Sequence, residues 1–200
     1  MKIGVLALQG AVAEHIAILS KLNVEATPIY SPSELNNLDA LIIPGGESTT
    51  ISKLMLDYGL AEPIRELASH DFPIFGTCAG MILLARKVTG SNSIKPLEIM
   101  DIEVKRNAFG RQIDSFEADL SVPALGDDTF RGIFIRAPLI EKTGPDVETL
   151  CQLNNQFIVA ARQGKTLACS FHPELTDDAR FHSYFLKLVA GDIFAKSDYR

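Results

Sequence analysis

Apolar and polar positions alternate in two different ways along the chain. In the first half, short apolar runs that predict buried strands lie at residues 3–8, 24–30, 38–43 and 73–76. Segments with apolar residues near helical spacing lie at residues 11–22, 49–58, 61–68 and 81–87. In the first of these segments the apolar positions are Val12, Ile16, Leu19 and Leu22. Strands that alternate with helices predict a parallel sheet covered by helices.

The second half of the chain is mostly strand-like. Strand patterns lie at residues 99–104, 115–120, 130–136, 147–153, 156–162 and 167–171. Glycines and prolines separate most of them, and an amphipathic helix is predicted at residues 179–189. Together the two halves predict an α/β fold whose sheet becomes antiparallel or mixed in its second part. We expect a single domain over residues 1–200.

Composition narrows the class of protein. The chain has 200 residues, 46% hydrophobic and 22% charged, which is typical of a globular domain. Its net charge of −6 argues against a nucleic-acid partner. Three cysteines without a CxxC pair favour neither a disulfide framework nor a zinc site. The N-terminal apolar run is too short for a signal peptide or a membrane span, so we expect a cytoplasmic protein without a membrane partner.

Cys78 lies in the pentapeptide GTCAG, between a predicted strand and a predicted helix. A nucleophile in this setting occupies a sharp turn that exposes its side chain at the carboxyl end of the sheet. The flanking glycines indicate a turn too crowded for Cβ atoms, and the helix N-terminus favours a thiolate. We therefore predict that Cys78 is a nucleophile; the alternative is a buried structural cysteine. Cys151 and Cys169 lie in apolar strand-like runs, which predict inert core packing.

A thiol nucleophile needs a base that removes and returns its proton, and histidine is the usual one. His172 follows the predicted strand at residues 167–171, so it lies at the same sheet edge as Cys78. Pro173 ends that strand, and Glu174 points to the same side as His172 in an extended chain. A carboxylate there can hold the imidazole, which is the third role of a triad. We predict a Cys78–His172–Glu174 triad, although the His-Pro-Glu sequence alone would also suit a surface turn.

The other three histidines give weaker signals. His15 and His182 fall in predicted helices, where solvated or packed positions without a catalytic role are expected. His70 precedes Asp71 in a predicted loop and belongs to no recognisable pattern. None of the three is assigned to the site.

Amide hydrolysis places negative charge on the carbonyl oxygen, which preorganised N–H groups must stabilise. The backbone N–H of Ala79, directly after the nucleophile, is one expected donor. The second expected donor is Gly46, in the sequence PGGES, because paired glycines let the backbone approach a ligand closely. An ordinary loop before a helix capped by Ser48 or Thr49 is the alternative. The loop is not a phosphate-binding loop, since no GK[ST] follows.

These motifs together resemble the class I glutamine amidotransferases, and among them the group of glutaminase subunits that serve pyridoxal 5′-phosphate synthases. The matching segments lie at residues 8–11, 14–15, 44–50, 76–80, 106–112, 114–117, 135–138 and 171–176. The segments 106–112 and 114–117 distinguish this group from other class I members. Residues 121–129 have no signature that we recognise and receive no role.

The resemblance implies a flavodoxin-like three-layer sandwich, with a mixed sheet and helices on both faces. It implies hydrolysis of L-glutamine to L-glutamate and ammonia through a thioester on Cys78, with no metal or organic cofactor. The ammonia would pass to a separate barrel-fold synthase subunit that makes pyridoxal 5′-phosphate, the vitamin B6 cofactor. The residues that would hold glutamine are Gly46, Glu47, Ser48, Arg106, Ile135 and Arg136.

Some of these implied roles also make physical sense. An arginine suits the substrate α-carboxylate, and Glu47 suits the α-ammonium group. A surface ion pair is the alternative for Arg106 and Arg136. We expect the isolated chain to be weakly active, because free ammonia would be wasted. Gln9 and Gly10 follow the first predicted strand at the inferred site, and we expect them to complete the oxyanion loop when the synthase binds.

Three other functions stay open on the sequence alone. Another class I glutaminase, such as the ammonia-supplying subunit of histidine biosynthesis, or a γ-glutamyl peptidase would share the Cys78 turn. Activation by each synthase partner separates these enzymes. A non-catalytic binding module would be marked by loss of a triad residue, and all three are present. An oxidation sensor based on Cys78 would not react with a glutamine-like alkylating agent.

Overall fold

The computed structural model describes residues 1–91, 93–108 and 115–191. The first half contains β1 (Lys2–Leu6), α1 (Val12–Lys21), β2 (Glu25–Ile29), η1 (Pro32–Leu35), β3 (Ala40–Ile43), α2 (Ser48–Asp57), α3 (Ala61–Ser69), β4 (Ile74–Thr77) and α4 (Ala79–Leu84). The second half contains β5 (Ala85–Thr89), β6 (Met100–Lys105), β7 (Ser115–Leu120), η2 (Pro123–Leu125), β8 (Phe130–Ile135), β9 (Leu139–Thr143), β10 (Glu148–Leu153), β11 (Phe157–Gln163), β12 (Thr166–Cys169), η3 (Pro173–Leu175) and α5 (Arg180–Ala190). The η segments are short 3-10 turns.

Most strands join one mixed sheet, with the order β2-β1-β3-β4-β12-β11-β9-β6-β5 and with β10 beside β11. β1 runs parallel to β2 and β3, and β4 runs parallel to β3 and β12. β11 pairs antiparallel with β12, β9 and β10. The predicted change from parallel to mixed pairing is therefore confirmed. Because β1, β3, β4 and β12 are parallel, the segments that follow them meet at one edge of the sheet.

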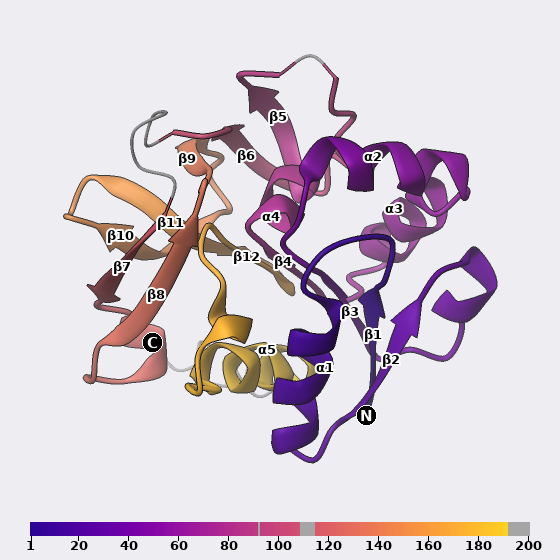
Figure 1. Ribbon diagram of the computed structural model, residues 1–200, viewed down its shortest axis with the longest axis horizontal. Helices are drawn as coiled ribbons and strands as arrows, with labels where there is room; N and C mark the ends of the chain where they lie inside the picture. Colours follow the sequence, from indigo (N-terminus) through magenta and orange to yellow (C-terminus); the bar gives the residue numbers. More distant parts are fainter. Residues whose placement is uncertain (92, 109–114, 192–200) are drawn as a thin grey trace.

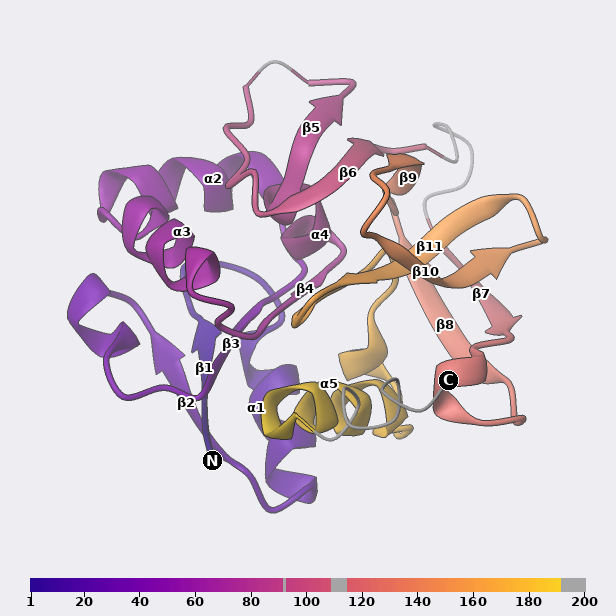
Figure 2. The ribbon, with the colours of Figure 1, turned by 180° about the vertical axis from the view of Figure 1, so that it is seen from behind.

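Helices cover both faces of this sheet. α1 and α5 lie side by side on one face, and α2 and α3 lie on the other (Figures 1 and 2). Under α2, α3 and α4 the buried side chains include Ile51 and Leu83. Under α1 and α5 they include Leu19 and Phe185. The expected sandwich, with a mixed sheet between two helical layers, is confirmed.

A two-stranded hairpin, β7–β8, adds to the core beside α5. The ring of Phe130 on β8 lies 4.9 Å from that of Phe181 on α5. On the same strand, the Ile133 carbonyl accepts a hydrogen bond of 2.8 Å from the N–H of His172. The hairpin therefore ties the segment after β12 to the rest of the fold.

The structure differs from the sequence predictions in two places. The helix predicted at residues 81–87 ends at Leu84, and the prediction is wrong beyond it, because Ala85–Thr89 forms β5. Alanine, arginine and lysine favour a helix intrinsically, but parallel pairing with β6 decides the conformation here. No strand is predicted at Leu139–Thr143, where β9 pairs with both β6 and β11.

Candidate active site

Cys78 lies between the end of β4 and the start of α4, with φ 48° and ψ −100°. Its N–H donates a hydrogen bond of 2.8 Å to the carbonyl of Cys169, the last residue of β12. A Cβ atom at Gly80 would lie 2.0 Å from the Ile43 carbonyl oxygen, and one at Gly76 would lie 2.6 Å from the Gly80 carbonyl carbon. The predicted crowding at the flanking glycines is confirmed. This close packing fixes the turn at the carboxyl edge of the sheet.

His172 and Glu174 follow β12 and reach the same edge. Nδ1 of His172 lies 2.7 Å from Oε1 of Glu174, and both side chains are buried. A hydrogen bond from Nδ1–H to the carboxylate leaves Nε2 as the nitrogen that can exchange a proton with Cys78. The structure thus brings together the three side chains that the sequence suggested.

The environment of His172 favours the imidazolium form. Burial alone lowers its pKa, but hydrogen bonds to Cys78 and Glu174, and the charges of these two groups, outweigh burial and raise the pKa to about 10. Cys151 and Cys169 lie in the hydrophobic core. Burial raises the pKa of Cys151 to about 11 and, with the charges of Glu174 and Cys78, holds that of Cys169 well above its usual value. Both are free, buried thiols, so the predicted inert packing is confirmed.

A cavity of about 540 Å³ opens at Cys78 and His172. The residues of its lining that the sequence analysis assigned are Gln9, Gly10, Gly46, Glu47, Ser48, Cys78, Ala79, Arg106, Ile135, Arg136 and His172. The lining also includes residues that were not predicted as site residues: Ala11, Glu14, Gly45, Ile82, Asn107 and Leu175. Glu174 does not line the cavity, and it reaches the site through its hydrogen bond to His172.

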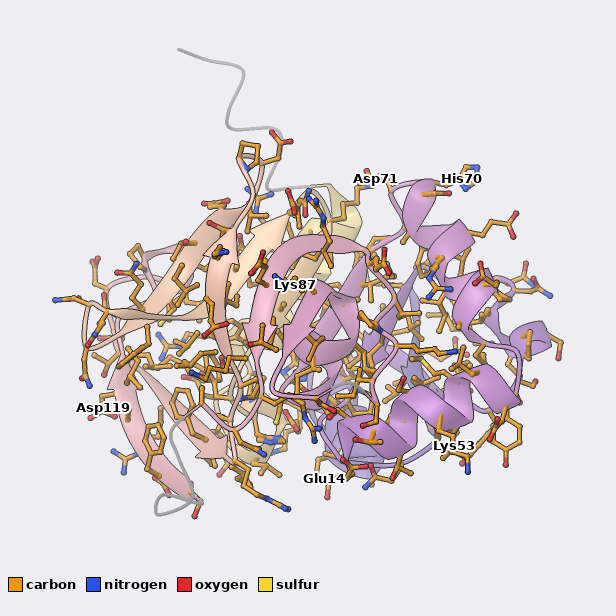
Figure 3. All side chains as sticks on the ribbon, turned by 90° about the horizontal axis from the view of Figure 1, so that it is seen from above. Glu14, Lys53, His70, Asp71, Lys87 and Asp119 are labelled. Carbon is orange, nitrogen blue, oxygen red and sulfur yellow. The ribbon has the colours of Figure 1, made fainter. Side chains whose placement is uncertain are left out.

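The cavity lies where the parallel strands end. Glu14 of its lining lies on the opposite side of the molecule from His70 and Asp71, which precede β4 (Figure 3). The fold therefore keeps His70, which was assigned no role, away from the site.

Gly45, which was not predicted as a site residue, packs against two side chains of the triad. A Cβ atom there would lie 2.3 Å from Cε1 of His172 and 3.3 Å from Cβ of Cys78. The Gly45 N–H donates to Oγ1 of Thr77 over 3.0 Å, and its carbonyl accepts from the N–H of Ala11 over 3.0 Å. The Gly45-Gly46 pair is the feature of the sequence that could have revealed this contact. Gly45 leaves room for the His172 ring, whereas the sequence analysis gave a role only to Gly46.

The two expected oxyanion donors both line the cavity. Across the described residues, the N–H groups of Gly46 and Ala79 donate no hydrogen bond to the protein. Gln9 anchors the loop that carries Gly46: its Oε1 accepts the N–H of Glu47 over 2.7 Å. A Cβ atom at Gly46 would lie 2.5 Å from the same oxygen. The Gln9 side chain therefore lies directly against the expected donor.

The side chain of Glu47 caps helix α2. Its carboxylate accepts hydrogen bonds from the N–H groups of Thr49 (3.2 Å) and Thr50 (2.7 Å), so the alternative of a cap by Ser48 or Thr49 is wrong. Burial favours the neutral carboxyl, but the hydrogen bonds from Thr50 and Thr49 outweigh it and lower the pKa of Glu47. Nη2 of Arg106 lies 3.4 Å from Oε1 of Glu47. The ion pair holds these two charged groups together at the rim of the cavity.

Ile135 and Arg136 border the cavity from the end of β8. The Ile135 carbonyl oxygen lies 3.8 Å from Sγ of Cys78 and can accept its S–H. Arg136 is exposed and has φ 43°, an uncommon conformation for a residue with a side chain. Of the two motifs that distinguish the glutaminase group, residues 109–112 and 114 lie outside the described residues.

Among the described residues, no group of three or more His, Cys, Asp or Glu side chains is arranged to hold a metal ion. None of the helices in this part of the chain is long and apolar enough to cross a membrane.

The sequence and the fold both match known proteins. Residues 5–190 match the SNO glutamine amidotransferase family. A protein of Dehalococcoides mccartyi named pyridoxal 5′-phosphate synthase subunit PdxT is 57% identical over 190 residues, which cover 94% of this chain and 97% of the relative. A Pelotomaculum thermopropionicum protein of the same name is 54% identical over 187 residues, 94% of each chain. A crystal structure described as glutamine amidotransferase has a TM-score of 0.89 and 48% identity, and the match covers 94% of this chain and 98% of that one. The chain belongs to the SNO glutamine amidotransferase family.

Proposed function

We propose that this chain is the glutaminase subunit of a pyridoxal 5′-phosphate synthase, built as one domain, and that it supplies ammonia from L-glutamine. The observation that carries the proposal is the convergence of Cys78 and the His172–Glu174 pair on one cavity. Membership of the SNO family supports glutamine as the substrate. The names of relatives above 50% identity support pyridoxal 5′-phosphate synthesis as the pathway.

In the first half of the proposed reaction, the Cys78 thiolate attacks the side-chain amide carbon of glutamine. The N–H groups of Gly46 and Ala79 stabilise the negative charge that develops on the carbonyl oxygen. His172, whose raised pKa keeps it protonated, gives its proton to the leaving nitrogen. Ammonia departs, and the γ-glutamyl group stays on the Cys78 sulfur as a thioester.

In the second half, His172 has lost its proton and acts as a general base. It takes a proton from water, and the hydroxide attacks the thioester carbon while Gly46 and Ala79 again hold the oxyanion. The carbon–sulfur bond breaks, L-glutamate leaves, and the thiolate–imidazolium pair is restored. Glu174 keeps Nδ1 of His172 hydrogen-bonded throughout, so Nε2 always faces the reacting atoms.

The remaining cavity residues are proposed to bind the substrate. Among the described residues that line the cavity, Arg106 and Arg136 are the arginines that can bind the α-carboxylate, and Ser48 and Ile135 belong to the same lining. Glu47 is proposed to face the α-ammonium group. Its carboxylate already caps α2 and pairs with Arg106, so it is held in a fixed position before glutamine enters.

The proposed partner is the barrel-fold synthase subunit, which receives the ammonia without its release to bulk water. We propose a cytoplasmic location for the complex. The three free thiols support it, because cysteines stay reduced there.

Measuring ammonia release from glutamine, by the purified chain alone and with a pyridoxal 5′-phosphate synthase subunit, tests this function. We expect weak activity alone and strong stimulation by the partner. The synthase subunit of histidine biosynthesis serves as the matched control partner and is expected to give no stimulation. Equal stimulation by both partners, or by the control alone, contradicts the proposed pathway, and no activity in any mixture contradicts the glutaminase itself.

Gln9 is proposed to link partner binding to the oxyanion loop, because its side chain lies against Gly46 and bonds to Glu47. Replacing Gln9 by alanine is expected to lower the partner-stimulated kcat by roughly 10- to 100-fold, less than the roughly 100- to 1000-fold cost of removing an oxyanion donor, because Gln9 acts only on the loop that carries the donor. The activity of the isolated chain is expected to change much less. Turnover equal to wild type with the synthase present would remove Gln9 from this role.

A further inference from the structure

His15 and His182 are buried side chains that the proposed mechanism does not use. His15 lies on α1 and His182 on α5, and both are 0% exposed. Nδ1 of His15 lies 2.9 Å from Nε2 of His182. Nε2 of His15 lies 3.2 Å from Oγ1 of Thr77 and 3.6 Å from Oε2 of Glu174. His15 therefore connects helix α5 to the carboxylate that holds His172.

Both rings are neutral near pH 7. Burial is the main cause that lowers the pKa of His15 well below its usual value, and the neighbouring His182 and His172 lower it further. Burial lowers the pKa of His182 to about 3. Glu174, His172 and His182 are the titratable groups that face His15. Each neutral ring carries one proton, so one of the two facing nitrogens donates and the other accepts.

Two arrangements of these protons give a hydrogen bond between Nδ1 of His15 and Nε2 of His182. They differ in whether Nε2 of His15 presents a proton or a lone pair to the Glu174 carboxylate. In the first, Nε2–H of His182 donates to Nδ1 of His15. The proton of His15 then lies on Nε2, where it faces Oε2 of Glu174 and Oγ1 of Thr77. In the second, Nδ1–H of His15 donates to His182, and the bare Nε2 of His15 turns a lone pair toward the carboxylate.

The second arrangement leaves two buried groups without partners. Within the described residues, Oε2 of Glu174 and Nδ1 of His182 have no other hydrogen-bond partner. The second arrangement puts the proton of His182 on that Nδ1, as a buried N–H with no acceptor, and gives Oε2 no donor. The first points an N–H at Oε2 from 3.6 Å, which is longer than a hydrogen bond but still attracts the buried carboxylate charge. It leaves Nδ1 of His182 as an acceptor without a donor and the Thr77 hydroxyl without a ring nitrogen as acceptor, but it places no lone pair against the carboxylate and no buried N–H without an acceptor.

We infer that His15 is a positioning residue whose Nε2–H faces the second oxygen of the Glu174 carboxylate, with His182 fixing the tautomer of His15. The inference rests on the proposed triad, because His15 acts through Glu174. Oε1 of Glu174 binds His172 over 2.7 Å, and Oε2, which has no hydrogen-bond partner among the described residues, lies 3.6 Å from Nε2 of His15. The N–H dipole of His15 attracts this oxygen and so favours the carboxylate position that keeps the His172 ring oriented toward Cys78.

The same contact reaches the oxyanion loop. Oγ1 of Thr77, which Nε2 of His15 approaches, accepts the N–H of Gly45 over 3.0 Å. Gly45 lies against the ring of His172 and directly precedes Gly46, the proposed oxyanion donor. The ring of His15 therefore lies behind the cavity, close both to Glu174 and to the hydroxyl that accepts the Gly45 N–H.

Nitrogen NMR of the full chain, with isotope-labelled imidazoles in its four histidines, tests the proton positions directly. Near neutral pH we expect His15 and His182 to be neutral and to carry their protons on Nε2. The variants His15→Gln and His182→Phe identify the signals. A His15 proton on Nδ1 overturns the inference. This measurement needs no catalytic activity, so it decides the inference even if the proposed function fails.

Kinetics of two His15 variants, each in complex with the synthase subunit, test the positioning role. His15→Leu keeps a buried side chain without an N–H, and we expect kcat to fall roughly 10- to 100-fold while KM for glutamine changes by less than about twofold. We expect loss of the His172 proton to limit wild-type kcat/KM above about pH 10, and this alkaline limb is expected to move to lower pH in His15→Leu, because Glu174 helps to raise the pKa of His172. His15→Gln places an amide N–H near the position of Nε2 and is expected to restore most of kcat and the limb.

Thermal unfolding of both His15 variants shows whether they are folded under the conditions of the kinetic measurements. The inference is overturned if folded His15→Leu has the same kcat and the same alkaline limb as the wild type. It is also overturned if His15→Leu and His15→Gln lose the same share of kcat. If His15→Leu does not fold, the tautomers of the wild-type chain decide. A wild-type complex without glutaminase activity contradicts the proposed function instead.

Discussion

Replacing Cys78 by alanine is expected to separate two activities of the synthase complex. Synthesis of pyridoxal 5′-phosphate from glutamine should fall by about 10⁴- to 10⁶-fold, because the attacking sulfur is removed and the rest of the site cannot replace it. Synthesis from added ammonium salt should stay at the wild-type rate, because ammonia then bypasses the glutaminase. Formation of pyridoxal 5′-phosphate from each nitrogen source, followed by absorbance, measures both.

Cys151→Ala is the matched control for loss of a thiol. Cys151 is buried on β10, and its raised pKa keeps the sulfur protonated, so its removal should leave both activities in place. Glutamine-dependent synthesis that survives in Cys78→Ala would contradict the assignment of the nucleophile. Loss of the ammonium-dependent activity as well would show that the substitution disturbs the complex and not the chemistry alone.

Gly45→Ala is expected to produce the second large loss, from a residue that takes no part in bond making. The added Cβ would lie 2.3 Å from Cε1 of His172, so the ring must move or the loop must shift. A displacement of about 1 Å at a catalytic base lowers kcat by roughly 100-fold. The loop also carries Gly46, so the oxyanion donor would move with it. The kcat of the glutaminase complex, with thermal unfolding as a check on folding, measures the effect.

Gly59→Ala provides a control for the general effect of adding a methyl group. Gly59 lies in the turn between α2 and α3 with φ 68°, and an added Cβ would meet no atom within 4 Å. The left-handed conformation makes alanine less stable there by about 1 kcal/mol, but kcat should not change. If Gly45→Ala keeps kcat within about twofold of wild type, the position of the His172 ring does not require the absence of a side chain at residue 45, and the prediction is wrong.

The strand–helix alternation of the first half was predictable because its apolar runs are short, continuous and separated by amphipathic segments. The boundary between α4 and β5 was not, because Ala85, Arg86 and Lys87 all favour a helix and only pairing with β6 makes them a strand. β9 was missed for a similar reason. Its run at Leu139–Thr143 is short, and its strand character comes from its two neighbours in the sheet.

The catalytic side chains were accessible from sequence because each follows a buried strand and is marked by glycine or proline. His15 was not, although it lies three residues after Val12 and four before Leu19 and so shares their helical face. A packed histidine without a catalytic role explains such a position equally well, and the structure buries His15 together with Ile18 and Leu19. A buried imidazole on a helix gives no sign of its partners, which here come from α5 and from the segment after β12.

The backbone conformation of Cys78 sets activity against folding stability at this position. With φ 48° and ψ −100°, the residue occupies a region that only glycine enters freely, at a cost of about 1–3 kcal/mol for any other side chain. Selection for a more stable fold would therefore favour glycine at this turn, and that replacement would silence the enzyme. The close packing of β4, β12 and α4 around the turn holds a cysteine in this conformation, so part of the stability of the core offsets the backbone strain that the nucleophile requires.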